Sequence, residues 1–209
     1  MLLNERVKKQ VQQRFAQLEG EVKLIVFTQE LECDFCRDTR EIAEEMAGLS
    51  EKVKVEVYDF VNDKAVADQY GIDKIPAIAV VGARDYGVRF FGLPGGYEFT
   101  SLLESVQMVS TGKADIADET IEFLDGLQQD LHLQVFVTPT CPYCPRAVVL
   151  AHALAVASDR VRADMVEISE FPQLGVKYQV QGVPRTVINE TIVQEGAAPE
   201  QMLIQKLQQ

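Results

Sequence analysis

Basic residues are scarce in this 209-residue chain: 20 lysines and arginines stand against 32 aspartates and glutamates, which gives a net charge of −12. Such a charge argues against binding to nucleic acid or to an anionic membrane, because both require a basic surface. No apolar run approaches the ~20 residues of a membrane-spanning helix. The charged segment 1–20 also lacks the apolar region of a secretory signal. We therefore expect a cytoplasmic protein.

Cysteine is equally scarce, and its four copies form two pairs of the same spacing, Cys33-x-x-Cys36 and Cys141-x-x-Cys144. Each pair follows an apolar run and precedes a helical pattern. At such a junction the first cysteine meets free N–H groups and the positive end of the helix dipole, which stabilise a thiolate. The second lies one turn on, close enough to close a disulfide. Because cytoplasmic disulfides are rare unless they are catalytic, the pairs favour redox or metal chemistry.

The two pairs belong to an internal repeat. Cys33 and Cys141 differ by 108 positions (141 − 33), and so do Tyr70 and Tyr178, and Pro76 and Pro184. Each half has the expected order helix, strand, helix, strand, helix, strand, strand, helix, which predicts a mixed sheet flanked by helices. The composition changes at 110–115, so we expect one domain at 1–112 and another at 113–209.

Hydrophobic periodicity sets the expected elements. The strand at 88–91 is interpreted as a sheet edge through which two copies would pair, so a homodimer is a further expectation. The expected helices cover 3–19, 37–49, 63–70, 97–109, 118–129, 147–157, 171–178 and 198–207, and the other strands cover 22–28, 53–60, 77–81, 133–137, 161–168, 185–189 and 191–195.

An isolated proline precedes an apolar strand in each half, as Ile75-Pro76 and Val183-Pro184. This pattern suggests a tight turn with a cis bond, since only X-Pro bonds adopt cis at low energy. Backbone groups of Ile75 and Val183 would then be free to pair with a substrate peptide. We also expect two aromatic residues inside the cysteine motifs to form an apolar docking surface around the disulfides. These residues are Phe35 and Tyr143.

With these motifs, each half resembles a thioredoxin fold, and the sequence CPYC is similar to the glutaredoxin motif. Two such halves in one chain resemble the protein disulfide oxidoreductases of thermophilic bacteria and archaea. The resemblance covers essentially the whole chain and implies dithiol–disulfide exchange with protein substrates in cell redox homeostasis: reduction, oxidation and isomerisation. By position it implies that the exposed nucleophiles are Cys33 and Cys141, the buried resolving thiols Cys36 and Cys144, and the cis-prolines Pro76 and Pro184.

Two departures from the thioredoxin pattern concern protons and electrons. Thioredoxins carry a buried acid on the strand before the motif, whereas 22–27 offers only Lys23 and 133–137 has no charge. The proton acceptor for the resolving thiols is therefore open, with water or Glu30 as choices. No G-x-G-x-x-G phosphate loop is present, so we expect no cofactor and an external, thioredoxin-reductase-like flavoenzyme as electron donor.

Three alternatives stay open. The first is an electron-transfer module between a flavoprotein reductase and a peroxidase. Such a module would resemble the tandem thioredoxin-fold N-terminal part of the alkyl hydroperoxide reductase flavoprotein. The first half would be a scaffold if it had lost catalysis. A metal-binding scaffold is disfavoured, because zinc ribbons place their pairs ~15–20 residues apart and 104 residues lie between Cys36 and Cys141. Neither His132 nor His152 lies near a motif, so we expect structural roles for both.

The two sites should differ in thiolate stability. No acid occurs at 131–157, where Arg146 lies in the first turn of the helix. Like charge disfavours a thiolate, so we predict the lower nucleophile pKa and the higher reduction potential at Cys141. Acids surround the first motif at Glu30, Glu32, Asp34, Asp38 and Glu41.

Overall fold

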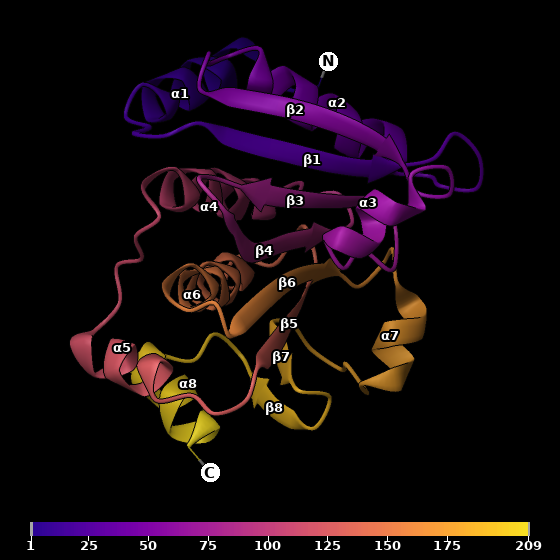
Figure 1. Cartoon of the computed structure of the whole chain (residues 1–209). Helices are drawn as coiled ribbons and strands as arrows, with labels where there is room; N and C mark the ends of the chain where they lie inside the picture. The colour runs from indigo at the N-terminus through magenta and orange to yellow at the C-terminus, as the bar shows by residue number, and fades with distance from the viewer. Residues whose placement is uncertain (1, 209) are drawn as a thin grey trace.

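The computed structural model describes residues 2–208 (Figure 1). Its helices are α1 (Glu5–Phe15), α2 (Cys36–Ala47), α3 (Lys64–Gln69), α4 (Glu98–Thr111), α5 (Asp118–Asp125), α6 (Cys144–Ala157), α7 (Pro172–Lys177) and α8 (Glu200–Leu207). Its strands are β1 (Val22–Thr28), β2 (Val53–Asp59), β3 (Ala77–Val81), β4 (Asp85–Phe91), β5 (Leu131–Val137), β6 (Val161–Glu167), β7 (Arg185–Ile188) and β8 (Ile192–Glu195). Among these helices, none is long and apolar enough to cross a bilayer.

The expected mixed sheets of the two halves are joined into one eight-stranded sheet of order β2-β1-β3-β4-β6-β5-β7-β8. The join is the parallel pairing of β4 with β6, from Val88 opposite Ala163 to Phe91 opposite Val166. The predicted α/β architecture, a mixed sheet flanked by helices in each half, is confirmed. The interpretation of 88–91 as a free edge is wrong, because both sides of β4 are already paired within the chain. A homodimer through this strand therefore has no basis.

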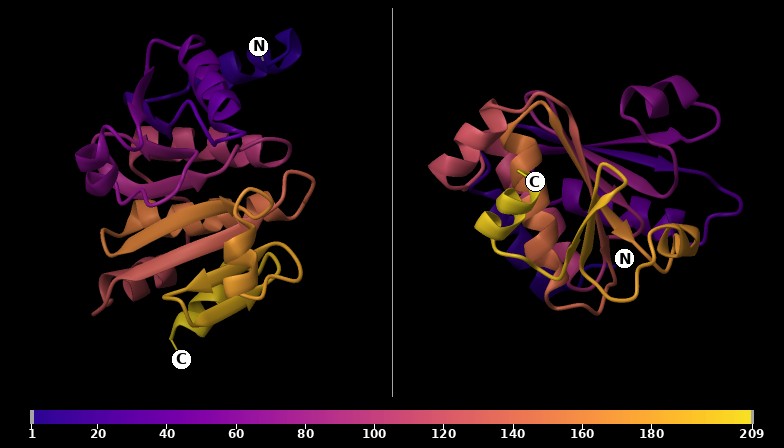
Figure 2. Two further views of the ribbon diagram at one scale, coloured as in Figure 1. Left: turned by 90° about the vertical axis from the view of Figure 1, so that its right-hand side faces the viewer. Right: turned by 90° about the horizontal axis from the view of Figure 1, so that it is seen from below.

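The strand directions bring the two cysteine motifs to one end of the sheet. β1 runs antiparallel to β3, and β3 antiparallel to β4, so β1 and β4 point the same way. β4, β6 and β5 are parallel to one another. The carboxyl ends of β1 and β5, which both lead into a Cys-x-x-Cys motif, therefore lie at the same end, which we call the thiol end. The two halves lie one beside the other, with the termini at opposite extremes (Figures 1 and 2).

The sheet is covered unequally on its two faces. A large apolar cluster packs one face against α1, α2, α4 and α6, and a smaller cluster packs the other against α3 and α7. The buried side chains of α2 recur every three or four residues, as one face of an amphipathic helix requires. α6 is buried on most sides, because it packs on the sheet with α4 and α5 beside it.

Packing between α4 and α6 includes one buried polar contact. Ser105 Oγ lies 2.8 Å from Nδ1 of His152, whose Nε2 lies 3.2 Å from the carbonyl oxygen of Arg89. Burial lowers the pKa of His152 to about 4, so the ring is neutral at ordinary pH. His132 instead bonds the buried carboxylate of Asp164 at 2.6 Å. Both histidines are hydrogen-bonded parts of the scaffold, as expected.

The repeat has one irregularity, just before the cysteines. β2 and β6 are offset by 108 residues (161 − 53), but their partners β1 and β5 begin opposite them at Val22 and Leu131, an offset of 109 (131 − 22). Since the cysteines are offset by 108, the loop before Cys33 is one residue longer than the loop before Cys141. Glu32 in the longer loop has a φ of 57°. The boundary after residue 112 stays a prediction.

Candidate active sites

Each cysteine pair forms a disulfide at the start of a helix. The second cysteine is the first helical residue in both cases, since α2 begins at Cys36 and α6 at Cys144. The Cα atoms are 5.5 Å apart in both pairs. All four sulfurs are therefore engaged in two equivalent redox-competent bonds at the thiol end.

Burial distinguishes the cysteines. Cys36 and Cys144 are 1% and 0% exposed, while Cys33 is partly exposed. Cys141 is only 7% exposed, less than an exposed nucleophile was expected to be. Its sulfur is covered because the proline loop approaches it: Sγ lies 3.8 Å from the carbonyl oxygen of Val183. A substrate would reach Cys141 along this loop.

Both proline loops have the form that the sequence suggested. The Ile75–Pro76 and Val183–Pro184 bonds are cis. The carbonyl oxygens of the two prolines accept backbone bonds, from Gly92 at 2.9 Å and Gly196 at 2.8 Å. Ile75 and Val183 are partly exposed and lie one residue outside these contacts.

Exposed apolar side chains gather at the thiol end of the sheet. Phe35 is 42% exposed and Tyr143 is 72% exposed, which fits the docking surface expected of them. The structure adds three residues that sequence reasoning missed: Leu31, Val61 and Tyr97 are 77%, 68% and 51% exposed. They follow the carboxyl ends of β1, β2 and β4, and only the strand directions reveal that these loops share one end of the sheet.

The second site has a specific donor for a thiolate. The backbone N–H of Cys144 donates to Sγ of Cys141 over 3.1 Å. A hydrogen bond to the charged form of a thiol favours that form. Around Cys33, the side chains of Glu30, Glu32 and Asp34 are exposed and add negative charge. The lower nucleophile pKa and the higher reduction potential of the second site stay predictions.

Glu98 is a buried acid that sequence reasoning missed. It is 1% exposed, and burial raises its pKa to about 7. Ser101 Oγ donates to Oε2 over 2.6 Å, whereas buried Oε1 has no hydrogen-bond partner among residues 2–208. In the sequence, Glu98 is indistinguishable from an ordinary acid in the first turn of a helix.

The position of Glu98 relates it to the second disulfide, although it comes from the first half. The preceding residue, Tyr97, donates its N–H to the carbonyl oxygen of Pro139, two residues before Cys141, over 3.0 Å. From there α4 runs beside α6, as the Ser105–His152 contact shows. The first turn of α4 therefore lies near the start of α6, where Cys144 is buried. The sequence could not show this, because the acid was expected on the strand of the same half.

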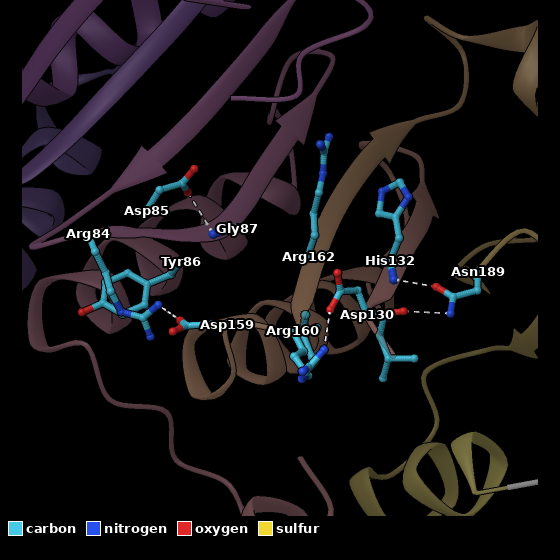
Figure 3. A pocket seen from close by; sticks show the side chains of 12 residues that line it. Arg84, Asp85, Tyr86, Gly87, Asp130, His132, Asp159, Arg160, Arg162 and Asn189 are labelled. Atoms are coloured by element: carbon cyan, nitrogen blue, oxygen red, sulfur yellow. Dashed lines mark hydrogen bonds and ion pairs between the residues drawn. The ribbon is translucent and has the colours of Figure 1, made fainter. Parts of the chain in front are cut away.

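A pocket of about 540 Å³ lies away from the disulfides (Figure 3). It opens where β5 and β6 begin, which is the end of the sheet opposite the thiol end. Four of its charged side chains pair with one another: Arg84 bonds Asp159, and Arg160 bonds Asp130 at 3.1 Å. Because these charges are paired within the protein, we interpret the pocket as part of the scaffold.

Residues 131–209 match the family model of the Thioredoxin domain. Together with the mixed sheet and the flanking helices, this match places the chain in the class of proteins built from two thioredoxin-like units, each with a Cys-x-x-Cys disulfide. The class rests on both the fold and the sulfur geometry.

Two solved structures match nearly the whole chain. The protein disulfide oxidoreductase of Aeropyrum pernix K1 is 27% identical with a TM-score of 0.91, covering 98% of this chain and 92% of that one. The N-terminal domain of the alkyl hydroperoxide reductase AhpF from Enterococcus faecalis is 26% identical with a TM-score of 0.91, covering 98% and 99%. The chain is thus a close structural match to both.

Curated relatives are longer than this chain. The alkyl hydroperoxide reductase AhpF of Xanthomonas campestris pv. phaseoli is 25% identical over 82% of this chain, and the NADH dehydrogenase of Bacillus subtilis is 25% identical over 90%. The chain spans 31% and 35% of the lengths of these two proteins.

Proposed function

We propose that the chain catalyses dithiol–disulfide exchange with protein substrates in the cytoplasm, with Cys141 as its principal nucleophile. The observation that carries this proposal is the second site: a disulfide at a helix start whose first sulfur receives an N–H bond and faces an open backbone segment at Val183. Exposed Tyr143 and Tyr97 supply apolar contact area beside it. An extended substrate segment would pair with the backbone at Val183 and pack on these rings.

The exchange proceeds through two displacements. In the reduced protein, the Cys141 thiolate attacks one sulfur of a substrate disulfide, and the other substrate sulfur leaves as a thiolate. Cys144 then loses its proton and attacks Sγ of Cys141, which releases the second substrate thiolate. Two electrons pass to the substrate and the Cys141–Cys144 disulfide is restored. The reverse sequence oxidises a substrate dithiol, and release of the mixed disulfide without resolution permits isomerisation.

Glu98 is proposed as the group that takes the proton of Cys144. A buried thiol must lose its proton before it attacks, and a carboxylate with a pKa of about 7 is a base of suitable strength at neutral pH. Its free Oε1 is the atom with unused capacity to accept that proton. Cys33 and Cys36 would follow the same displacements, with Ile75, Pro76 and Phe35 around them, but without such a base. Among residues 2–208 the buried carboxyl groups are Glu98, Asp164 and Glu167, and that of Glu170 is partly buried; none of them lies in β1, α2 or the loop between them.

The electrons would come from a thioredoxin-reductase-like flavoenzyme, since the sulfur chemistry itself needs no cofactor. The names of the relatives favour a second candidate function: a dedicated electron carrier between a flavoprotein reductase and a peroxidase. Both functions use the same chemistry and differ in the range of partners. A broad range of protein disulfides favours the first, and a single efficient partner favours the second.

Turbidimetric insulin reduction with dithiothreitol tests the proposal. We expect the intact chain and the Cys33→Ser variant to accelerate precipitation of the insulin B chain, and the Cys141→Ser variant to fail. Absence of activity in the intact chain would contradict general exchange and favour the dedicated carrier. Activity that depends on Cys33 alone would contradict the assignment of the principal nucleophile.

A further inference from the structure

A pocket of about 370 Å³ opens beside Cys33. It lies between the carboxyl ends of β1 and β2 and the first turns of α2. The lining places two guanidinium groups and two carboxylates around the only partly exposed sulfur among the four cysteines. Its polar lining includes Gln29, Glu30, Arg37, Arg40 and Asp59.

The charges of this pocket are only partly paired. Arg40 donates from Nε to Glu44 over 2.6 Å, and Asp59 Oδ1 accepts two backbone N–H groups of the loop after it. Arg37 and Glu30 are exposed and form no ion pair with another residue in 2–208. One cation and one anion therefore remain free beside a reactive sulfur.

The second half does not repeat this arrangement. At the offset of 108, Arg37 corresponds to Pro145 and Arg40 to Val148. These two guanidinium groups therefore have no counterpart at the same positions of the second site. Because the scaffold is the same in both halves, the difference points to a different substrate rather than to a need of the fold.

We propose that the Cys33 site exchanges disulfides with small amino-acid disulfides, of which cystine is the simplest. Arg37 and Arg40 would bind the carboxylate of the amino acid, and Glu30 would bind its ammonium group. The pocket volume lies near the lower end of the range for small-ligand sites. The proposal rests on the proposed function, since it assumes that Cys33 and Cys36 perform thiol–disulfide exchange.

The reaction balances without a further reagent. The Cys33 thiolate attacks one sulfur of cystine, the S–S bond breaks, and one cysteine leaves as a thiolate that takes a proton from water. Cys36 then loses its proton and attacks Sγ of Cys33, which releases the second cysteine. The protein dithiol is oxidised to the Cys33–Cys36 disulfide, and one cystine is reduced to two cysteines. In reverse, two cysteine molecules reduce the protein disulfide.

The negative charge around Cys33 predicts the opposite substrate preference. Glu30, Glu32 and Asp34 are exposed around the site, so the general field attracts cations. Cystamine has the same disulfide as cystine and two ammonium groups, but no carboxylate. If only the electrostatic field of these acids determines the rate, cystamine reacts faster. If Arg37 and Arg40 bind a carboxylate, cystine reacts faster.

The test isolates Cys33 in the full chain by combining Cys36→Ser, Cys141→Ser and Cys144→Ser. Mixed-disulfide formation with cystine and with cystamine is followed by acid quenching and intact mass spectrometry. Each rate is divided by that of the same disulfide with dithiothreitol, which removes differences in intrinsic reactivity. We expect the normalised rate with cystine to be about five times that with cystamine. In Arg37→Gln this ratio should fall below one, because a charge-assisted contact is lost.

A matched control removes a cation elsewhere. Arg146→Gln, in the first turn of α6, makes the same change in net charge and should leave the ratio unchanged. Arg40→Gln should lower the ratio as Arg37→Gln does. A ratio of one or less in the parent, or a ratio that neither arginine substitution changes, overturns the proposal. If Cys33 then still reacts with insulin, only the substrate class fails, and if it reacts with neither, the proposed exchange function fails at this site too.

Discussion

The two halves of the chain place the same disulfide on the same scaffold and surround it differently. At the first site, Cys33 is partly exposed, exposed acids flank it and a polar pocket opens beside it. At the second, Cys141 is 7% exposed and a backbone N–H bonds its sulfur at 3.1 Å. A Cys-x-x-Cys motif thus fixes the bond that is exchanged, while the neighbouring residues decide which partners reach it and how readily the thiolate forms.

The comparison also shows that the halves are not independent. Glu98 belongs to α4, which completes the first half in sequence, yet the preceding residue, Tyr97, bonds the carbonyl oxygen of Pro139 just before the second motif. The join of β4 with β6 places α4 beside α6. The first half thereby places a buried acid in the helix that packs beside α6, and no counterpart of that acid is found in α2 or β1.

Replacement of the nucleophiles has the largest expected effect and tests directly whether the two sites contribute unequally. Cys141→Ser should lower insulin reduction by about a hundredfold or more, because the serine hydroxyl does not form the mixed disulfide. Cys33→Ser should retain most of the activity. Near-equal losses in the two variants would show that the sites act in series rather than separately.

Replacement of Glu98 should change how stability depends on pH. The pKa of Glu98 is raised from 4.5 to about 7 by burial, so the folded state binds this proton more tightly than the unfolded state. The folded state therefore loses stability as pH rises from 4.5 through about 7, by up to about 3 kcal/mol. Glu98→Gln should lack this loss when urea unfolding is compared at about pH 5 and about pH 8.

Glu170→Gln is the matched control for that experiment. Burial raises the pKa of Glu170 to about 7 as well, and its carboxylate accepts the N–H of Leu93 over 2.7 Å, at the join of the halves. Both substitutions should flatten the pH dependence of stability. Only Glu98→Gln should also slow insulin reduction at neutral pH, and equal slowing by both would remove the case for Glu98 as the proton acceptor.

Reduction potentials measure the difference between the two cysteine pairs directly. The Cys141 pair should have the higher potential, by about 30 mV if its thiolate is favoured by about 1.4 kcal/mol. Equilibration with glutathione buffers, followed by alkylation and mass spectrometry of each peptide, measures both pairs in one sample. A higher potential for the Cys33 pair would contradict the charge argument.

Much of the fold could be predicted from the sequence, because its signals are local. Apolar alternation and the repeat of Cys33, Tyr70 and Pro76 at a fixed offset locate the strands, the helices and both proline loops. What escaped prediction depends on strand order. The role of Val88–Phe91 as the join was missed because an apolar strand looks the same at an edge and in the middle of a sheet. Glu98 and Tyr97 were missed because they reach the second site only through that join.

The smallest expected effect concerns the acids around Cys33. Asp34→Asn removes an exposed negative charge between the two cysteines, and we expect it to lower the pKa of the Cys33 thiol by a few tenths of a unit, since exposed charges are screened. A larger reactivity of Cys33 towards a neutral disulfide at fixed pH would follow, and it should weaken as salt is added. The matched change Pro142→Asp places an acid at the corresponding position of the second motif and should raise the pKa of Cys141, by more than Asp34→Asn lowers that of Cys33, because Cys141 is more buried. Shifts of equal size at both sites would show that burial does not distinguish them electrostatically, and that the contrast between the halves lies in their substrates alone.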